Sequence, residues 1–380
     1  MKKTKIAAIF AAAVITLTGC GADTRFAGTI NGEEIPAGVY IYEQMQAFYE
    51  AYTSMSAEDQ QAATPIFEAV IDGVPSRQWI ADKTVKNLRE YAAVNEKFAA
   101  LGLGYSTDDN GIPMDQLVDE SIDYSWEEGI APTLTPFGIS KESYRLIQLN
   151  AVKRQELFEY YYGVGGEKEV PEEEIKKYLS ERFAHIDYFE MPLRDGEGNL
   201  LKSDGKTERM DMAKDYVARA ESGEDFNEIM GQYNDWYAEL TKTAADETAE
   251  AADAAAADPQ ASPEDEAPPT NDVVITKDSA NPSAEVDAKV FEYQAANPDF
   301  TAPQYFIVEA ANGETYWVVK LIPLFENTSY FEDNRESAVY EMKNEEFSDL
   351  IDIWTRDQSL ILNEKAVARY QPDMFTAEES

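Results

Sequence analysis

Apolar residues recur every three to four positions over much of the chain, which is the spacing of one face of a helix. The first such stripe begins at Val39 and continues to Tyr52, and a later one runs from Phe347 to Ile361. Gly102 follows the longest of the early stripes and suits the left-handed residue that commonly ends a helix. The spacing predicts helices over 39–52, 76–101, 115–128, 140–162, 208–222, 226–233, 286–295 and 329–370.

Segments rich in β-branched and aromatic residues predict strands. The clearest of them covers 183–191, and Asn31-Gly32 and Asn312-Gly313 each separate two apolar segments, as in a two-residue hairpin turn. Further strands are predicted at 273–275, 305–308 and 316–321. Because helices gather toward both ends of the chain, the pattern predicts an α+β fold with a helical lobe and an inserted α/β lobe.

The first twenty residues have the pattern of an export signal. Lys2, Lys3 and Lys5 precede an apolar run over 6–18 that is too short to cross a membrane as a helix. The run ends in Leu-Thr-Gly-Cys, which resembles the lipobox of bacterial lipoproteins and implies cleavage after residue 19 and a lipid on the sulfur of Cys20. The alternatives are an ordinary signal peptide with an incidental cysteine, or a buried core cysteine.

Charge and composition exclude several classes of function. The chain has 32 Lys and Arg against 73 Asp and Glu, a formal charge of −41, which repels nucleic acid and anionic lipid headgroups. One cysteine and one histidine, His185, exclude a disulfide framework and a Cys/His zinc cluster within one chain. We therefore expect no cofactor, no metal and no nucleic-acid partner.

Residues 244–272 differ in composition from the rest of the chain. They include eleven Ala, nine acidic residues and four Pro, and no Lys or Arg. Such a segment buries little apolar surface, and its like charges keep it extended. We predict a disordered insertion over this range.

Three short motifs, in this order, carry a resemblance to a known family. They are Thr29-Ile-Asn-Gly-Glu-Glu-Ile35, the predicted helix start Val170-Pro-Glu-Glu-Glu-Ile-Lys-Lys-Tyr178, and Glu221-Ser-Gly-Glu-Asp-Phe226 followed by Tyr233. Together they resemble extracytoplasmic foldases of the SurA/PrsA type, which join a helical chaperone domain to a parvulin-like peptidyl-prolyl isomerase domain. After the signal peptide over 1–19, the resemblance implies a helical chaperone domain over 20–180, a parvulin-like domain over 181–326 and a C-terminal helix over 327–380 that packs on the chaperone domain.

The same resemblance assigns the candidate site residues. His185 matches the first of two family histidines, Trp317 stands where the second is expected, and Asp235 lies one residue before the expected acid. The family's Gly-Gly-x-Leu-Gly segment is absent, and Val286 replaces a phenylalanine of the proline slot. With so much of the site changed, we expect weak or absent isomerase activity. If the family resemblance is set aside, the sequence predicts that His185 is an ordinary sheet residue and that Asp235 is a helix-end or turn residue.

The predicted function is that of an extracytoplasmic chaperone, anchored to the cell membrane by its lipid, whose partners are unfolded or newly exported polypeptides. One alternative is an active peptidyl-prolyl cis-trans isomerase. The other is a solute-binding lipoprotein of a transporter, which predicts alternating βαβ units with parallel strands. The sequence shows no such alternation.

Replacing the only thiol tests the anchor. We expect Cys20→Ala to release the protein from membranes, because the chain has no other thiol to modify. The measurement is sedimentation with membranes after an alkaline wash, with Thr18→Ser as a matched control that keeps the cysteine. A Cys20→Ala variant that still sediments with washed membranes contradicts lipid anchoring.

Overall fold

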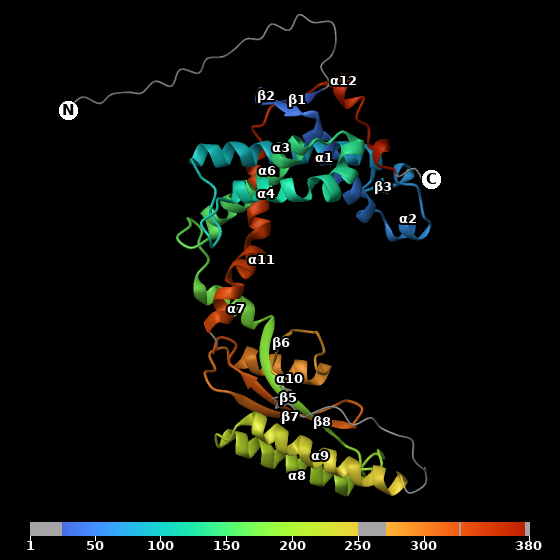
Figure 1. Cartoon of the computed structure of the whole chain (residues 1–380), viewed down its shortest axis with the longest axis vertical. Coiled ribbons are helices and arrows are strands. Elements are labelled where there is room, and N and C mark those ends of the chain that lie inside the picture. Colours follow the sequence, from blue (N-terminus) through green and yellow to red (C-terminus); the bar gives the residue numbers. More distant parts are fainter. Residues whose placement is uncertain (1–24, 250–270, 327, 377–380) are drawn as a thin grey trace, which may run out of the picture. The chain divides into compact units, whose positions relative to one another are not determined.

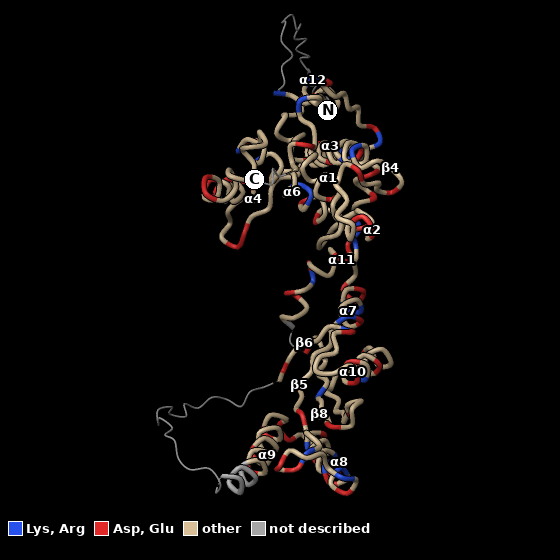
Figure 2. The backbone as a smooth tube through the Cα atoms, turned by 90° about the vertical axis from the view of Figure 1, so that its right-hand side faces the viewer, with Lys and Arg blue, Asp and Glu red and all other residues tan. Residues whose placement is uncertain are grey.

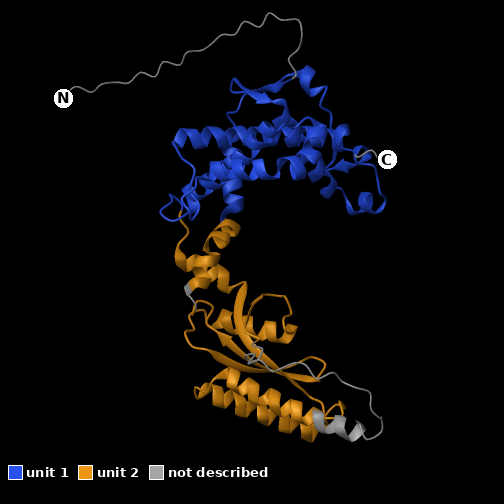
Figure 3. Ribbon diagram, viewed as in Figure 1, with its two compact units in different colours: residues 1–168, 343–380 blue, residues 169–342 orange. Residues whose placement is uncertain are grey.

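A computed structural model describes residues 25–249, 271–326 and 328–376 (Figure 1). The chain forms two compact units, unit 1 with residues 1–168 and 343–380 and unit 2 with residues 169–342 (Figure 3). Both units contain helices and strands, so the fold is α+β. The predicted signal peptide and Cys20 lie outside the described residues. In the part of the chain that the structure describes, no helix is both long and apolar enough to cross a membrane.

Unit 1 is built on long helices with small strand pairs beside them. Its principal helices are α1 (Ala37–Thr53), α2 (Ala57–Gln61), α3 (Ser76–Leu101), α4 (Met114–Ser125), α5 (Ala131–Leu134), α6 (Lys141–Tyr162) and α12 (Glu364–Val367). Its strands are β1 (Phe26–Ile30), β2 (Glu33–Pro36), β3 (Val70–Ile71), β4 (Val74–Pro75) and β9 (Leu360–Leu362). The hairpin of β3 and β4, and the short helix α2, are elements that the hydrophobic pattern did not predict.

The Asn-Gly turn between β1 and β2 also determines where the C-terminal helix ends. Asn31 and Gly32 have positive φ, as this turn requires. The Asn31 side-chain amide donates to the Gln358 side chain at 2.8 Å, and its oxygen accepts from the backbone N–H of Ser359 at 2.8 Å. The chain is therefore held beside the turn and pairs with β1 as β9. The prediction of a helix to 370 was wrong, and Ile361 lies in β9 with an exposed side chain.

The core of unit 1 lies between α1, α3 and α6 and extends to the C-terminal helix α11 (Thr328–Thr355), which begins in unit 2 and ends in unit 1. Close packing of α1 on α6 depends on Gly38, where a Cβ atom would lie 2.3 Å from the hydroxyl of Ser143. On α11, Phe347 is 1% exposed, and its ring lies 5.3 Å from that of Phe158 and 6.2 Å from that of Tyr162.

Unit 2 contains a four-stranded sheet in which every strand pair is antiparallel. Its strands are β5 (Phe183–Pro192), β6 (Val273–Thr276), β7 (Gln304–Glu309) and β8 (Thr315–Ile322), in the spatial order β6-β5-β8-β7. Its helices are α7 (Glu172–Ser180), α8 (Ser203–Glu221), α9 (Phe226–Ala249) and α10 (Ala284–Ala296), together with the start of α11. The antiparallel pairing does not match the parallel βαβ units that the solute-binding alternative requires.

The two faces of this sheet have separate cores. On one face, Phe189 of β5 packs against Tyr233 of α9, with ring centres 5.2 Å apart. On the other face, Ile186 of β5 packs with Val286 and Val290 of α10, and all three are fully buried. Figure 1 shows α8 and α9 beneath the sheet and α10 on its other side. Because successive side chains of β5 point into two different apolar layers, the direction of each of its side chains is determined.

The predicted insertion over 244–272 is ordered at both ends. Helix α9 continues to Ala249, because alanine and glutamate favour a helix whatever their net charge. At the other end, Asn271 donates a side-chain hydrogen bond to the backbone oxygen of Tyr188 at 2.8 Å, and Asp272 pairs with His185. The prediction of disorder was therefore wrong for 244–249 and for 271–272, and residues 250–270 lie outside the described residues.

Truncating Phe347 tests whether the C-terminal end of α11 belongs to the core of unit 1. We expect Phe347→Ala to lower the free energy of unfolding by about 3–5 kcal/mol, as deletion of a buried aromatic ring does. The measurement is urea unfolding followed by circular dichroism. The matched control is Ile353→Ala on the same helix, where the side chain is exposed and the expected loss is below about 1 kcal/mol. Equal losses in both variants would contradict this packing.

Candidate functional site

The only histidine of the chain lies on an inner strand of the sheet in unit 2 and has a carboxylate partner. His185 is on β5, opposite Val274 of β6, and its side chain is 22% exposed. Its Nε2 atom is hydrogen-bonded to Oδ1 of Asp272, which comes just before β6. A carboxylate in this place fixes the orientation of the imidazole ring. His185 is therefore a paired and partly accessible side chain.

Asp187, two residues further along β5, is a buried acid on the same face. It is 2% exposed, and its Oδ1 atom has no hydrogen-bond partner among the described residues. Its direct neighbour across the sheet is Lys320 of β8. Burial and the nearby charge of Asp272 raise the pKa of Asp187, and the charge of Lys320, the backbone N–H of Tyr188 and His185 oppose this shift.

The alternation of β5 brings these side chains together. Phe189 faces α8 and α9, so Asp187 and His185, two and four residues earlier, project from the same face of the sheet. The register of β5 with β8 adds Lys320, and the residues before β6 add Asp272. We call His185, Asp187, Asp272 and Lys320 the polar cluster.

The polar cluster combines two carboxylates with two groups that donate hydrogen bonds. His185 and Lys320 are suited to donate to carbonyl oxygens, and the carboxylates of Asp187 and Asp272 are suited to accept from N–H groups. This set matches the polar groups of a polypeptide main chain. The cluster itself contains no serine, threonine or cysteine that would serve as a nucleophile.

The other residues that the family resemblance selected lie elsewhere. Asp235 is exposed on α9, and the acid beside His185 is Asp272 instead. Trp317 is opposite Glu190 on β5 and packs with the core on the α10 side of the sheet. Val286 is fully buried in that same core. The structure therefore does not gather the expected histidine position, acid and proline slot around His185.

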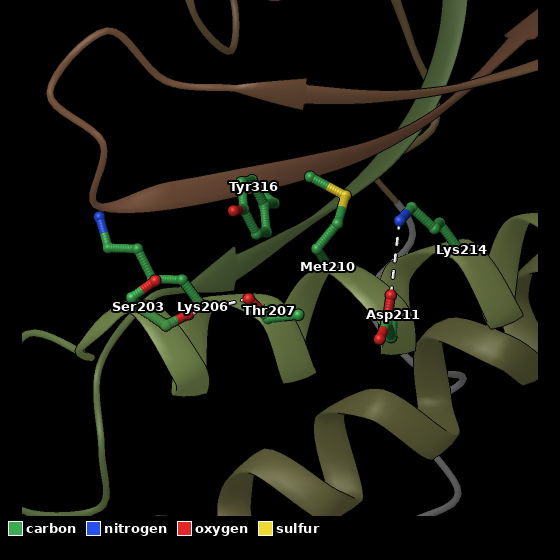
Figure 4. Close-up of a pocket in the computed structure, with 7 residues that line it drawn as sticks. All are labelled: Ser203, Lys206, Thr207, Met210, Asp211, Lys214 and Tyr316. Carbon is green, nitrogen blue, oxygen red and sulfur yellow. Dashed lines mark hydrogen bonds and ion pairs between the residues drawn. The ribbon is translucent and has the colours of Figure 1, made fainter.

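Two surface cavities lie away from the polar cluster. The larger, of about 490 Å³, is lined by Ser203, Lys206, Thr207, Met210, Asp211, Lys214 and Tyr316 (Figure 4). Its two cations already have partners, since Lys206 donates to the backbone oxygen of Gly313 at 2.5 Å and Lys214 pairs with Asp211 at 3.4 Å. The other, of about 230 Å³, lies between α4 and α6 of unit 1. No group of three or more potential metal ligands occurs among the residues that the structure describes.

Sequence reasoning found His185 and missed the other three members of the polar cluster. A signal for Asp187 was present, because an aspartate within an apolar strand is unusual unless it is paired or functional. Asp272 was missed because composition assigned it to the insertion. Lys320 became a neighbour only through the register of β8, which no local pattern reports.

These observations define a two-unit α+β protein whose second unit carries a polar cluster on a four-stranded antiparallel sheet. No protein-family model matches the sequence, and no curated protein matches it. Among solved structures, the foldase protein PrsA from Lactococcus lactis is similar with 12% sequence identity and a TM-score of 0.30, over 92% of this chain and 98% of that chain. A TM-score this low does not define a shared fold, so the class of the protein follows from its own architecture.

Neutralising Asp187 tests the electrostatics of the polar cluster. A raised pKa means that the folded protein favours the protonated acid, so the ionised form costs stability as the pH rises above the ordinary value of about 4. We therefore expect Asp187→Asn to unfold at a higher urea concentration than the wild type at pH 7. The difference should disappear at low pH, where the wild-type carboxyl is protonated in both states.

Asp235→Asn is the matched control, because this exposed side chain on α9 should leave the urea midpoint unchanged at either pH. A lower midpoint for Asp187→Asn at pH 7 would show that attraction by Lys320 and His185 exceeds the cost of burial.

Proposed function

We propose that this protein is a membrane-anchored, extracytoplasmic chaperone that holds unfolded or newly exported polypeptides. The observation that carries the proposal is the aromatic surface of α1. Tyr49 is 50% exposed and Tyr52 is 43% exposed, although both rings pack edge-on against the buried ring of Phe48, at 5.6 and 5.2 Å. Rigid tyrosine rings offer apolar contact area together with a polar hydroxyl, which suits adaptable binding of many sequences.

The charge of the chain supports this function. Acidic positions are distributed over the helices of both units, without a large basic region (Figure 2). A net charge of −41 keeps copies of the chain apart while they expose aromatic rings. It also favours clients that are neutral or basic, so the same surface limits self-association and selects partners.

The anchor in this proposal rests on the sequence motif that ends at Cys20. Lipidation of that cysteine would hold both units close to the membrane that exported polypeptides have just crossed.

The polar cluster supports a second candidate function, peptidyl-prolyl isomerisation. Rotation about an X–Pro bond needs no covalent step, but a catalyst must stabilise the twisted imide and hold the proline ring in an apolar slot. The hydrogen-bonded pair of His185 and Asp272 supplies polar groups that stabilise the twisted imide. Val286, which the resemblance assigned to the slot, lies in the opposite core, so the chaperone remains the better supported function.

Two assays on the same variants separate the two functions. We expect Tyr49→Ser/Tyr52→Ser to need roughly tenfold more protein than the wild type to suppress light scattering by chemically unfolded citrate synthase, because two aromatic contacts are lost. We expect His185→Ala to suppress scattering as the wild type does. We also expect both proteins to show the same slow isomerisation of proline tetrapeptides.

The matched control is Tyr124→Ser on α4, which removes a 94% exposed ring that lies outside the α1 surface. If this control loses as much activity as the double variant, the α1 surface is not the client site. Fast isomerisation that His185→Ala abolishes would replace the chaperone with the isomerase.

A further inference from the structure

Strand β7 forms one edge of the sheet in unit 2 and, apart from Pro303 directly before it, lacks the usual protection of an edge. Its segment Tyr305-Phe-Ile-Val308 is a run of four apolar residues with strong preference for strands. Natural proteins protect such edges with proline, lysine, a bulge or a covering element. Within β7, only Gln304 and Glu309 at its two ends are polar, and its pairing with β8 is regular.

The hydrogen-bond pattern shows which main-chain groups lie at the open side. The backbone N–H of Ala310 donates to the oxygen of Thr315 at 3.0 Å, so these residues form a hydrogen-bonded pair directly after β7. In an antiparallel ladder such pairs alternate along the strands. The N–H and C=O groups of Tyr305, Ile307 and Glu309 therefore point away from β8.

These outward groups have no partner in the described part of the chain. None of them takes part in a backbone hydrogen bond, and the side chains of Tyr305 and Ile307 are only partly buried. Helices α8 and α10 lie over the two faces of β7, where Ile307 joins the core on the α8 side and Phe306 the core on the α10 side. The other edge strand, β6, offers less open main chain. It has only four residues, and the backbone oxygen of Thr276 already accepts from the backbone N–H of Ser279.

The electrostatics of the edge indicate what kind of strand fits there. Burial raises the pKa of the Tyr305 hydroxyl, and the charges of Asp225, Glu221 and Glu326 raise it further. These carboxylates come from the junction of α8 and α9 and from the residues after β8, near Tyr305 at one end of β7, and Glu309 lies at the other end. A second copy of this acidic edge would be repelled, whereas a strand with basic residues near its ends would be attracted.

We propose that the open edge of β7 binds an extended, apolar client segment with flanking Lys or Arg residues by adding it to the sheet as a fifth strand. The inference rests on the proposed chaperone function and names how one class of client segment is held. Main-chain hydrogen bonds to Tyr305, Ile307 and Glu309 give affinity that is independent of sequence. The carboxylates at the edge give the preference for basic flanks.

The test uses a fluorescein-labelled peptide of roughly eight residues, long enough for a typical strand, with alternating threonine and valine between two terminal lysines. We expect it to bind the full-length protein, to protect the amides of Tyr305, Ile307 and Glu309 from hydrogen exchange, and to dissociate more readily as salt increases. The same peptide with an N-methyl group on every residue between the lysines should bind at least about tenfold more weakly, because neither of its edges can donate to the outward carbonyls of β7. A peptide with terminal glutamates should also bind more weakly.

Two variants at one position separate main-chain pairing from apolar contact. Ile307→Pro removes an outward N–H, which edge strands tolerate, and should weaken peptide binding at least about tenfold. Ile307→Ala removes more of the side chain than the proline does, keeps the N–H, and should bind within about threefold of the wild type. Thermal unfolding shows whether each variant is folded, and the N-methylated peptide decides the question on the unaltered protein if Ile307→Pro is not.

Several outcomes would overturn the edge proposal. The first is equal binding of the N-methylated and parent peptides, and the second is protection of amides elsewhere in the chain. The third is a wild-type dimer that Ile307→Pro dissociates, which would assign the edge to a second copy. The aggregation assay keeps this inference distinct from the proposed function. Suppression of aggregation without peptide binding at β7 refutes the edge alone, whereas peptide binding at β7 without suppression refutes the chaperone and leaves the edge site standing.

Discussion

The burial of strand β5 between two apolar layers is the constraint on which the chemistry of unit 2 depends. Ile186 must face α10 and Phe189 must face α9, because each belongs to a different core. Because side chains alternate along a strand, His185 and Asp187 project toward the α8 and α9 side of the sheet, as Phe189 does. A buried aspartate is costly, and the nearby Lys320 and His185 offset that cost only in part.

The excess of acidic residues affects both units in a similar way. Several of the basic side chains are already bound to carboxylates, as in the pairs Arg77–Asp373 at 2.6 Å in unit 1 and Arg194–Glu314 at 2.5 Å in unit 2. Exposed pairs of this kind contribute little to stability, so their main effect is on the surface charge. The acids that remain leave the chain with a net negative charge. In the proposed chaperone function, solubility and preference for basic clients therefore have the same physical origin.

The two proposed client surfaces differ in how they recognise a chain. Tyr49 and Tyr52 on α1 offer rings, whose contacts have little dependence on direction or sequence. The edge of β7 offers main-chain donors and acceptors, which require an extended partner in a defined register. A chaperone with both surfaces would hold collapsed apolar segments on unit 1 and extended segments on unit 2.

The sequence alone determined the elements that depend on neighbouring residues. The bounds of α3 and the turn at Asn31 follow from local periodicity and from residues that accept positive φ, and the structure confirms both. Only the tertiary structure decided which segments pair. The strand at Ile361, the contact of Asp272 with His185 and the position of Lys320 each depend on a partner far away in the chain. The spacing of residues within a segment does not identify that partner, because strand register is selected by the burial of whole faces of a sheet.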